Sequence, residues 1–330
     1  MKLLVIGGTV FVGRNIVEKA LENGHEVTIL HRGKSPHPPE WKVTEVLADR
    51  DGGLAALGDG PWDAVVDCVG YVPRIVRDSA EFLKDRTRLY LYISSISIYE
   101  EGKDGEPFAN YDQPPVIGEE ITGETYGKLK LECEKEVNKV FGERSIIVRP
   151  GIVAGAYDPT NRFTYWADRF GRYESVLVPD LPDCPIQVID SRDLGAFCVK
   201  LLEGDRFGIF NACGPIVPLN KLVEFGENQG IGVATWVDWN LLSSEGLQLG
   251  KDFPLCTEPK DYNSIYKRIN NQPSLNAGLK LRPFHNTFHY TLQWSMHHRE
   301  LPPVGSTRTG TVGLERPREE ELLQKYQDRS

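Results

Sequence analysis

The chain has 330 residues, of which 40% are hydrophobic and 26% are charged. This composition excludes disordered and fibrous classes, and the length favours one large domain with a subsidiary lobe. The formal net charge of −9 disfavours nucleic acid and acidic membrane surfaces as partners, so an anionic ligand would need a local cluster of basic side chains.

The first half of the chain alternates short apolar runs with helical segments, which predicts βαβ units and a parallel sheet. The predicted strands are 2–6, 27–30, 43–47, 64–67, 88–94 and 145–148. Because these runs are almost continuously apolar, helices should cover both faces of the sheet. A first helix ends at Asn23-Gly24, and a second spans about 124–140. The predicted fold class is α/β, a Rossmann-type doubly wound parallel sheet with a smaller C-terminal substrate lobe.

The regular alternation ends after Gly155, and this change predicts the domain boundaries. We expect residues 1–155 to form a dinucleotide-binding core, to which 184–213 return. Residues 156–183 and 214–304 would form the substrate lobe. Residues 305–330 would be a polar C-terminal tail with a last helix at about 315–327.

Six cysteines are scattered along the chain without a close pair in the sequence. This usage is typical of reduced thiols and predicts a cytoplasmic protein. The opening residues resemble a signal peptide, but their apolar run ends at Gly7 and is too short for one. No other stretch approaches the roughly 20 apolar residues of a membrane span, so we expect a soluble protein.

A glycine-rich turn separates the first predicted strand from the first predicted helix. It contains Gly7, Thr9, Val10, Phe11, Val12 and Gly13. Glycines there let the chain turn tightly and bring the N–H groups of the helix N-terminus up to a pyrophosphate. Such turns also occur for packing alone, but this position between strand and amphipathic helix favours a dinucleotide site.

The ends of the second and third predicted strands should contact the adenosine of that dinucleotide. The second strand runs into His31 and Arg32, with no carboxylate in the slot that would bind a ribose 2′-hydroxyl. Arg32 can meet a 2′-phosphate, which favours NADP over NAD, and a solvated basic loop is an equal alternative. Asp49, after the third strand, could accept the adenine amino group or only shape a turn.

Tyr126 and Lys130 lie four residues apart on a predicted helix, so they project from one face. An ammonium beside a phenol favours the phenolate, and a positioned tyrosine can then exchange a proton with an alcohol. Ser94 and Ser95 end the fifth predicted strand, where open α/β sheets place their ligands. A serine there could hold a substrate oxygen or only complete the hydrogen bonds of the strand.

These motifs resemble the extended and atypical short-chain dehydrogenase/reductase family, the NAD-dependent epimerases and dehydratases. The resemblance runs from Met1 to about Trp294 and includes 149–153 and 190–193. It implies that Ser95 orients the substrate, that Tyr126 is the acid/base, and that Lys130 contacts the nicotinamide ribose. The further residues implied to line the cofactor are Cys68, Val69, Gly70, Ser94, Pro150, Ile152 and Val153.

The chain departs from the family pattern at two places. Val10 stands where most extended members have glycine, and with Phe11 it resembles the atypical branch, which includes chloroplast stem-loop RNA-binding proteins. Ser95 is followed by Ile96 and Ser97, where sugar-nucleotide dehydratases carry an Asp-Glu pair for elimination. We therefore do not expect a dehydratase.

Two clusters remain in the expected substrate lobe. Arg162, Tyr165 and Trp166 could stack on a base or sugar and pair with a phosphate, or they could pack in the core of the lobe. Four histidines between 285 and 298 lack a convincing set of further ligands, so we expect surface imidazoles and no metal site.

The sequence therefore predicts an NAD(P)-dependent oxidoreductase for a secondary alcohol or ketone, acting as a reductase or, through transient oxidation, as a sugar-nucleotide epimerase. Its partner would be a small polar substrate, nucleic acid is not expected, and a homodimer is compatible. Two alternatives stay open, an RNA-binding protein of the atypical branch and an NADP-binding redox sensor without turnover. The presence of Ser95, Tyr126 and Lys130 together favours the enzyme, as does the acidic balance.

Overall fold

The computed structural model describes residues 1–298, 305–307 and 310–327. The chain divides into two compact units, which are described separately. The first unit comprises Met1–Gly151, Ser191–Cys213 and Arg268–Lys280, and the second comprises Ile152–Asp190, Gly214–Lys267 and Leu281–Ser330. None of the described helices combines the length and the apolar character that a membrane crossing requires.

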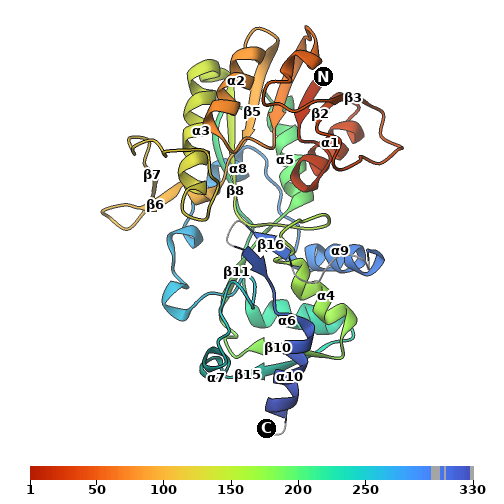
Figure 1. Cartoon of the computed structure of the whole chain (residues 1–330), viewed down its shortest axis with the longest axis vertical. Coiled ribbons are helices and arrows are strands. Elements are labelled where there is room, and N and C mark those ends of the chain that lie inside the picture. Colours follow the sequence, from red (N-terminus) through yellow and green to blue (C-terminus); the bar gives the residue numbers. More distant parts are fainter. Residues whose placement is uncertain (299–304, 308–309, 328–330) are drawn as a thin grey trace. The chain divides into compact units, whose positions relative to one another are not determined.

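Within the described residues, the first unit is built on a parallel sheet of seven strands (Figure 1). Their order is β13 (Gly208–Ala212), β8 (Ser145–Pro150), β5 (Thr87–Ile93), β4 (Trp62–Asp67), β1 (Lys2–Ile6), β2 (Glu26–His31) and β3 (Val43–Leu47). The chain moves outward from β1 to β3 and then returns to β4 on the other side of β1. This is the doubly wound Rossmann order, so the predicted fold class is confirmed, and the switch point lies between β1 and β4.

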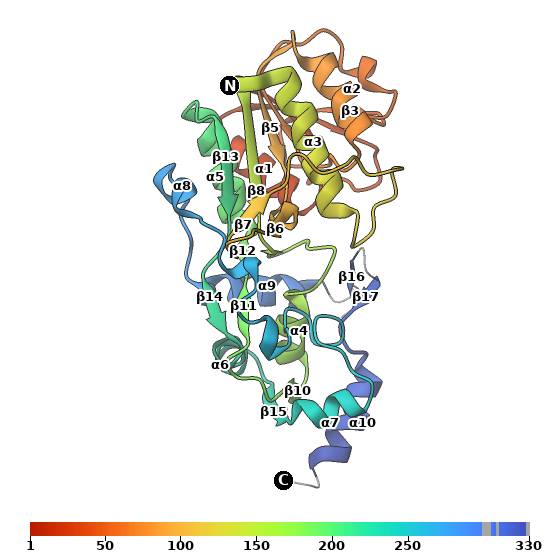
Figure 2. The ribbon, with the colours of Figure 1, turned by 90° about the vertical axis from the view of Figure 1, so that its left-hand side faces the viewer.

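Helices cover both faces of this sheet (Figures 1 and 2). They are α1 (Phe11–Glu22), α5 (Ser191–Glu203), α2 (Pro73–Leu83) and α3 (Tyr126–Phe141), while the short α8 (Gln272–Asn276) lies against the edge strand β13. α1 packs beside α5, and α2 packs beside α3. In β1, Leu4 and Ile6 belong to the core that α2 and α3 cover, whereas the equally buried Leu3 and Val5 point to the other face. Both faces are therefore apolar, as the continuous apolar runs predict.

The second unit has a core of helices and short two-stranded sheets. Its described helices are α4 (Thr164–Arg172), α6 (Leu219–Gln229), α7 (Trp239–Ser244), α9 (Phe284–His297) and α10 (Arg316–Gln327). Its strand pairs are β9 (Val153–Ala154) with β12 (Ile189–Asp190), β10 (Ser175–Pro179) with β15 (Val233–Val237), β11 (Pro185–Gln187) with β14 (Ile216–Pro218), and β16 (Gly305–Thr307) with β17 (Gly310–Val312). α4 packs on α6 and α9, and α10 packs on β10 and β15 (Figure 2).

This division differs from the expected boundaries because long-range pairing decides where a segment belongs. Residues 184–190, expected in the core, form β11 and β12 of the second unit, and 152–155 belong to that unit as well. Residues 268–280, expected in the lobe, belong to the first unit, where Asn271 hydrogen-bonds the backbone of Cys213 through both side-chain atoms. Parts of the expected lobe and tail, 299–304, 308–309 and 328–330, lie outside the described residues.

The expected polar tail is, in its described part, a core element of the second unit. Leu322 and Leu323 of α10 are buried in that core. Glu319 is also fully buried, and its carboxylate lies 3.1 Å from the guanidinium of Arg169 and accepts a hydrogen bond from Leu177 N. The expectation of a separate tail is wrong here. The composition of α10 is mostly polar, but one face of the helix is apolar and Glu319 forms a buried ion pair.

Candidate active site

The glycine turn between β1 and α1 leaves no room for side chains at its two key positions. Gly7 has φ +85°, in the left-handed region that favours glycine. A Cβ on Gly13 would overlap the carbonyl oxygen of Gly7, so the start of α1 lies directly against the turn. Val10 caps α1 without a side-chain hydrogen bond, and the first turn holds no acidic residue. This turn suits a pyrophosphate, which takes hydrogen bonds from backbone N–H groups and favours the positive end of a helix.

The loop after β4 meets this turn. A Cβ on Gly7 would also overlap Val69, the residue that follows Cys68 at the end of β4. The side chain of Val69 is 38% exposed. Burial raises the pKa of the Cys68 thiol well above its ordinary value. The structure therefore brings Gly7 and Val69 together at the switch point of the sheet.

At the end of β2, the two predicted residues differ in role. Arg32 is exposed, whereas His31 is buried. His31 Nδ1 accepts from Gly33 N at 3.3 Å, which leaves Nε2 to donate to Glu45 at 2.8 Å. His31 thus shapes the loop that carries Arg32. Glu45 of β3 is a carboxylate that the sequence motif did not reveal near this position, and its oxygen also lies 3.8 Å from His37.

After β3, Asp49 accepts a hydrogen bond from Asp51 N at 3.0 Å, the geometry of the turn residue that was its alternative role. The next residue, Arg50, points inward and pairs with the fully buried Asp67 at 2.6 Å. Ser79 accepts from the same guanidinium at 2.7 Å. Burial tends to raise the pKa of Asp67, but Arg50, Tyr90 and Lys130 together outweigh it and the net pKa is lowered. This ion pair joins the ends of β3 and β4.

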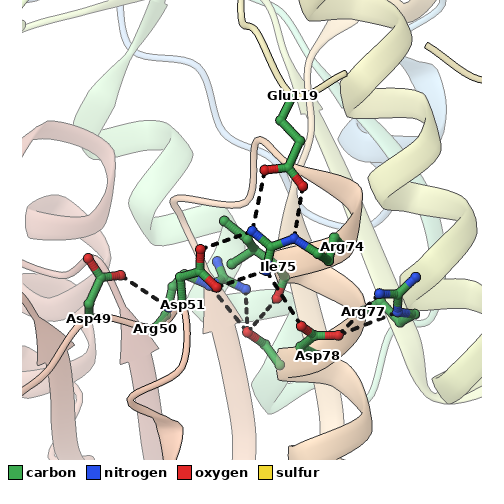
Figure 3. A network of polar contacts seen from close by, with 9 residues as sticks. Asp49, Arg50, Asp51, Arg74, Ile75, Arg77, Asp78 and Glu119 are labelled. Atoms are coloured by element: carbon green, nitrogen blue, oxygen red, sulfur yellow. Dashed lines mark hydrogen bonds and ion pairs between the residues drawn. The ribbon is translucent and has the colours of Figure 1, made fainter. Parts of the chain in front are cut away.

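Arg74 at the start of α2 joins three segments on the surface (Figure 3). Its guanidinium donates two hydrogen bonds to Asp51, at 2.8 and 3.0 Å, and two to Glu119, at 2.8 and 3.3 Å. Glu119 lies in the segment that leads into α3. The pKa of Asp51 is lowered by these hydrogen bonds. Arg74 thus connects the loop that holds Asp49 with the segment that precedes Tyr126.

Tyr126 is the first residue of α3, and Gly127 determines how closely the start of this helix approaches the turn that follows β5. A Cβ on Gly127 would overlap the carbonyl oxygen of Ser97 in the 3₁₀ turn η2 (Ile96–Ile98). In that turn Ser95 Oγ accepts from Ser97 N at 3.1 Å. The helix carrying Tyr126 and the turn after Ser95 are therefore in direct contact.

Lys130 lies one turn further along α3 and is almost completely buried. Its ammonium donates to the carbonyl oxygens of Gly70, at 2.7 Å, and Ile93, at 2.5 Å. It also lies over the rings of Tyr92 and Tyr71, 4.3 and 5.0 Å from their centroids. Burial lowers the pKa of Lys130, and the nearby Tyr126 opposes this shift. The carboxylates of Asp67 and Glu134 also oppose the shift, but they pair with Arg50 and Arg149, and no ion pair joins either of them to Lys130 within the described residues.

Ser94, at the end of β5, is buried, and its hydroxyl has no hydrogen-bond partner among the described residues. Its backbone N–H bonds Val148 O at 2.7 Å, so the strand pairing is already complete without the side chain. A buried hydroxyl without a protein partner is uncommon, and it fits a polar ligand at this strand end.

Tyr71 was missed in the sequence, although it directly follows Gly70 at the end of β4. Its ring centroid lies 6.4 Å from that of Tyr126, and Lys130 lies over its face. Glu134 and Arg149 were also not recognised as a pair. They form a buried ion pair at 2.5 Å between α3 and β8, and this pair fixes the helix that carries Tyr126.

The remaining predicted residues fall in two places. Pro150 ends β8 in the first unit, whereas Ile152 and Val153 begin the second. Tyr165 and Trp166 are fully buried in the core of the second unit, so their predicted stacking on a ligand is wrong and core packing explains them. Their neighbour Arg162 is half-buried, and its Nε donates to Thr160 at 3.1 Å.

The chain belongs to the NAD dependent epimerase/dehydratase family, whose model matches residues 3–213. The predicted family is thereby confirmed, and the match includes the glycine turn, η2, Tyr126 and Lys130. A 3-beta-hydroxysteroid dehydrogenase of Mycolicibacterium neoaurum is 46% identical over 184 residues, which cover 48% of this chain and 49% of that protein. The chloroplast stem-loop binding protein of 41 kDa b of Arabidopsis thaliana is 25% identical over 233 residues, 64% of this chain and 58% of that protein. The chain thus spans about half the length of the curated relatives it matches.

Solved structures agree on the fold. The UDP-glucose 4-epimerase of Thermus thermophilus, in complex with NAD, superimposes with a TM-score of 0.63 at 17% identity and covers 89% of this chain and 98% of its own. The epimerase Mth375 of Methanothermobacter thermautotrophicus gives a TM-score of 0.63 at 16% identity, over 91% and 93% of the two chains. At such low identities the likeness establishes the architecture alone.

Proposed function

We propose that this chain is an NADP-preferring oxidoreductase that moves a hydride to or from a secondary alcohol or ketone, with Tyr126 as its acid/base. The observation that carries the proposal is the burial of Lys130 beside Tyr126. A buried cation without a carboxylate partner is costly, and such groups gather at active sites. The carbonyls of Gly70 and Ile93 occupy two of its three N–H donors and leave one for a ribose hydroxyl.

The chain's own residues supply position and a proton path. When bound, the nicotinamide supplies the hydride. Gly7 and Gly13 shape the turn that holds the pyrophosphate. Ser95 orients the substrate oxygen, and Tyr126 gives that oxygen a proton or takes one from it. The ammonium of Lys130 stabilises the phenolate that forms when Tyr126 loses its proton.

The preference for NADP rests on Arg32 and on the state of Glu45. Arg32 is exposed at the end of β2, and Glu45 is held by His31, which disfavours its use as a ribose acceptor. Replacing Arg32 by alanine should weaken NADP binding by about 1.5–3 kcal/mol and leave NAD binding unchanged. Calorimetric titration of both cofactors measures this, with Lys34→Ala as the control. Equal affinities for both cofactors in the wild type would contradict the preference.

The dehydrogenase relative supports a proposal for the substrate class. Its 46% identity over 184 residues favours a hydroxyl or ketone on an apolar ring over a sugar nucleotide. A screen that compares the turnover of 3β-hydroxysteroids with that of UDP-sugars, each with both cofactors, tests this substrate preference. Turnover of UDP-sugars alone would reverse it.

The decisive test of the mechanism is Tyr126→Phe, which removes one hydroxyl and keeps the ring. We expect kcat to fall about 10² to 10⁴-fold, the contribution of a positioned acid/base, while cofactor affinity stays the same. Tyr266→Phe, on the exposed part of the second unit, is the matched control and should keep full activity. A Tyr126→Phe variant with wild-type turnover would refute the assignment.

An RNA-binding function is the second candidate, and the likeness to the chloroplast stem-loop binding protein favours it. The net charge of −9 opposes it, since phosphate neutralisation dominates such affinities. Titration of a fluorescent stem-loop RNA at low and physiological salt distinguishes the two. Salt-dependent binding without any turnover would favour this candidate.

A further inference from the structure

The loop after β4 places one aromatic residue, Tyr71, beside the residues of the proposed reaction. Tyr71 lies between Gly70 and the start of α2, whereas Tyr126 is the first residue of α3, and these two helices pack beside each other. The ring centroids of Tyr71 and Tyr126 lie 6.4 Å apart, with their planes inclined by 38°. The starts of two helices therefore bring the two phenols together.

The ammonium of Lys130 lies inside a shell of neutral groups. The carbonyl oxygens of Gly70 and Ile93 accept hydrogen bonds from it, and the ring centroid of Tyr92 lies 4.3 Å away. All three of these residues are buried. The ring centroid of Tyr71 lies 5.0 Å from the same ammonium, but Tyr71 is only half-buried. Tyr71 therefore belongs to the part of this shell that faces solvent.

Hydrogen bonds fix the backbone that leads to Tyr71. At the end of β4, the buried carboxylate of Asp67 accepts from Val69 N at 3.1 Å. The hydroxyl of Tyr92, in β5, donates to the carbonyl oxygen of Gly70 at 2.8 Å. A Cβ on Gly70 would overlap the ring of Tyr92, so the chain lies directly against β5 here. The fold thus determines the position of Tyr71, because the residues before it are held by the sheet.

An aromatic ring over an ammonium acts on it in two ways. The negative face of the π system attracts the cation, and this attraction is stronger where water is excluded. The ring also keeps water away, so nearby charges are screened less. For Lys130, weaker screening strengthens its electrostatic interaction with Tyr126. Water in the place of the Tyr71 ring would weaken this interaction.

We propose that Tyr71 is a positioning residue for hydride transfer, whose ring covers the ammonium of Lys130 and keeps it directed at Tyr126 and the cofactor ribose. This inference rests on the proposed function, in which Lys130 serves that phenol and that ribose. Tyr71 itself exchanges no proton. Its aromatic face carries the role and its hydroxyl does not, so phenylalanine can replace it, whereas a small or aliphatic side chain cannot.

The first test measures access to the Lys130 amine and needs neither substrate nor cofactor. The full-length protein is treated with limiting acetic anhydride, and mass spectrometry compares acetylation of Lys130 with that of Lys128, which is exposed on the same helix. We expect Lys130 to be protected in the wild type and in Tyr71→Phe, and to react many times faster in Tyr71→Ala. Tyr266→Ala, at an exposed tyrosine of the second unit, is the control and should leave Lys130 protected.

Urea unfolding of each variant shows whether it is folded under the conditions of labelling. Equal protection of Lys130 in folded Tyr71→Ala and in the wild type would overturn the proposal. So would rapid acetylation of Lys130 in the wild type, because the ring would then not cover the amine.

The second test follows turnover across pH. Tyr71→Leu keeps an apolar side chain but has no π face, and we expect its kcat to fall about 2- to 30-fold, the range of a cation–π contact. The acid side of its kcat profile should move to higher pH, because the phenolate is stabilised less, while KM changes little. Tyr71→Phe should keep the wild-type profile. A Tyr71→Leu profile equal to the wild type, or an equal loss in Tyr71→Phe, would overturn the role of the ring.

A double-mutant cycle shows whether Tyr71 acts through Lys130. If it does, Tyr71→Leu should change kcat far less in a Lys130→Met background than in the wild type. Equal effects in both backgrounds would overturn the proposal. The acetylation test also separates this inference from the proposed function. A wild type without turnover of any alcohol or ketone contradicts the proposed function, whereas access to Lys130 tests the cover by Tyr71 in either case.

Discussion

Two buried cations, one in each unit, show how differently the chain accommodates a positive charge. In the second unit, the guanidinium of Arg169 lies 3.1 Å from the carboxylate of Glu319, and both side chains are fully buried. In the first unit, the ammonium of Lys130 is held only by carbonyl oxygens and aromatic faces in the described part of the chain. A paired buried charge can be explained by folding alone. A buried charge with neutral contact partners costs stability, which supports the role proposed for Lys130.

The same contrast holds inside the first unit. Arg50 pairs with Asp67, and Arg149 pairs with Glu134, each across the ends of neighbouring elements. These pairs fix the elements that surround Lys130. These ion pairs, the unpaired ammonium of Lys130 and the close contact at Gly127 lead to four predictions on the free energy of unfolding.

The largest effect is expected for Glu319→Gln. The substitution leaves the Arg169 charge buried without its partner, which should lower the free energy of unfolding by about 3–5 kcal/mol. Urea unfolding followed by circular dichroism measures it. Glu320→Gln, one residue away and exposed, should change stability by less than about 0.5 kcal/mol. Equal effects for the two variants would show that the buried pair does not stabilise the second unit.

Gly127→Ala should come next. Alanine normally favours a helix, but here its Cβ would overlap Ser97 O, and overpacking costs about 1–3 kcal/mol. Because the start of α3 must move, we also expect weaker cofactor binding. Lys128→Ala, exposed on the same helix, is the control. A Gly127→Ala variant that is more stable than wild type would contradict the close contact of α3 with η2.

Lys130→Met should leave stability unchanged or raise it, within about 1 kcal/mol, since a hydrophobic residue replaces a buried charge. The direction in which the free energy of unfolding changes with pH follows from the pKa of Lys130, which is lowered in the folded state. The unfolded chain binds the proton more tightly, so wild-type stability rises with pH between the folded pKa and the ordinary value near 10.5. The advantage of the methionine variant should therefore be largest at low pH and shrink toward pH 10.5.

Measurements of unfolding across this pH range test the linkage, and cofactor titration of the same variant tests the function. A clear loss of stability in Lys130→Met at neutral pH would mean that Lys130 serves the fold. The comparison with Arg169 would then fail.

The smallest effect is expected for Arg74→Gln. Its ion pairs with Asp51 and Glu119 are exposed, and solvent screens such pairs strongly (Figure 3). The free energy of unfolding should be unchanged at physiological salt, as urea unfolding can measure. A large loss of stability would show that this surface network stabilises the first unit.

Short-range patterns in the sequence predicted much of the local architecture of the first unit, although not β13, α2 or α5. The six predicted strands, the turn from Gly7 to Gly13 and the helix that carries Tyr126 and Lys130 all follow from them. Apolar runs, glycine positions and the four-residue spacing of a helix are properties of neighbouring residues, so they can be recognised without the fold. The family pattern rests on the same local motifs.

Which residues share an environment depended instead on contacts between distant segments. Segments far apart in the chain meet where Lys130 is buried between Gly70 and Ile93 and where Arg169 pairs with Glu319. The assignment of 268–280 to the first unit and of α10 to the second depends on hydrogen bonds and packing of the same kind. Composition suggested a polar tail at α10 and allowed Tyr165 and Trp166 to stack on a ligand. The burial of these residues could not be recognised from the sequence, because the partners that bury them lie in other segments.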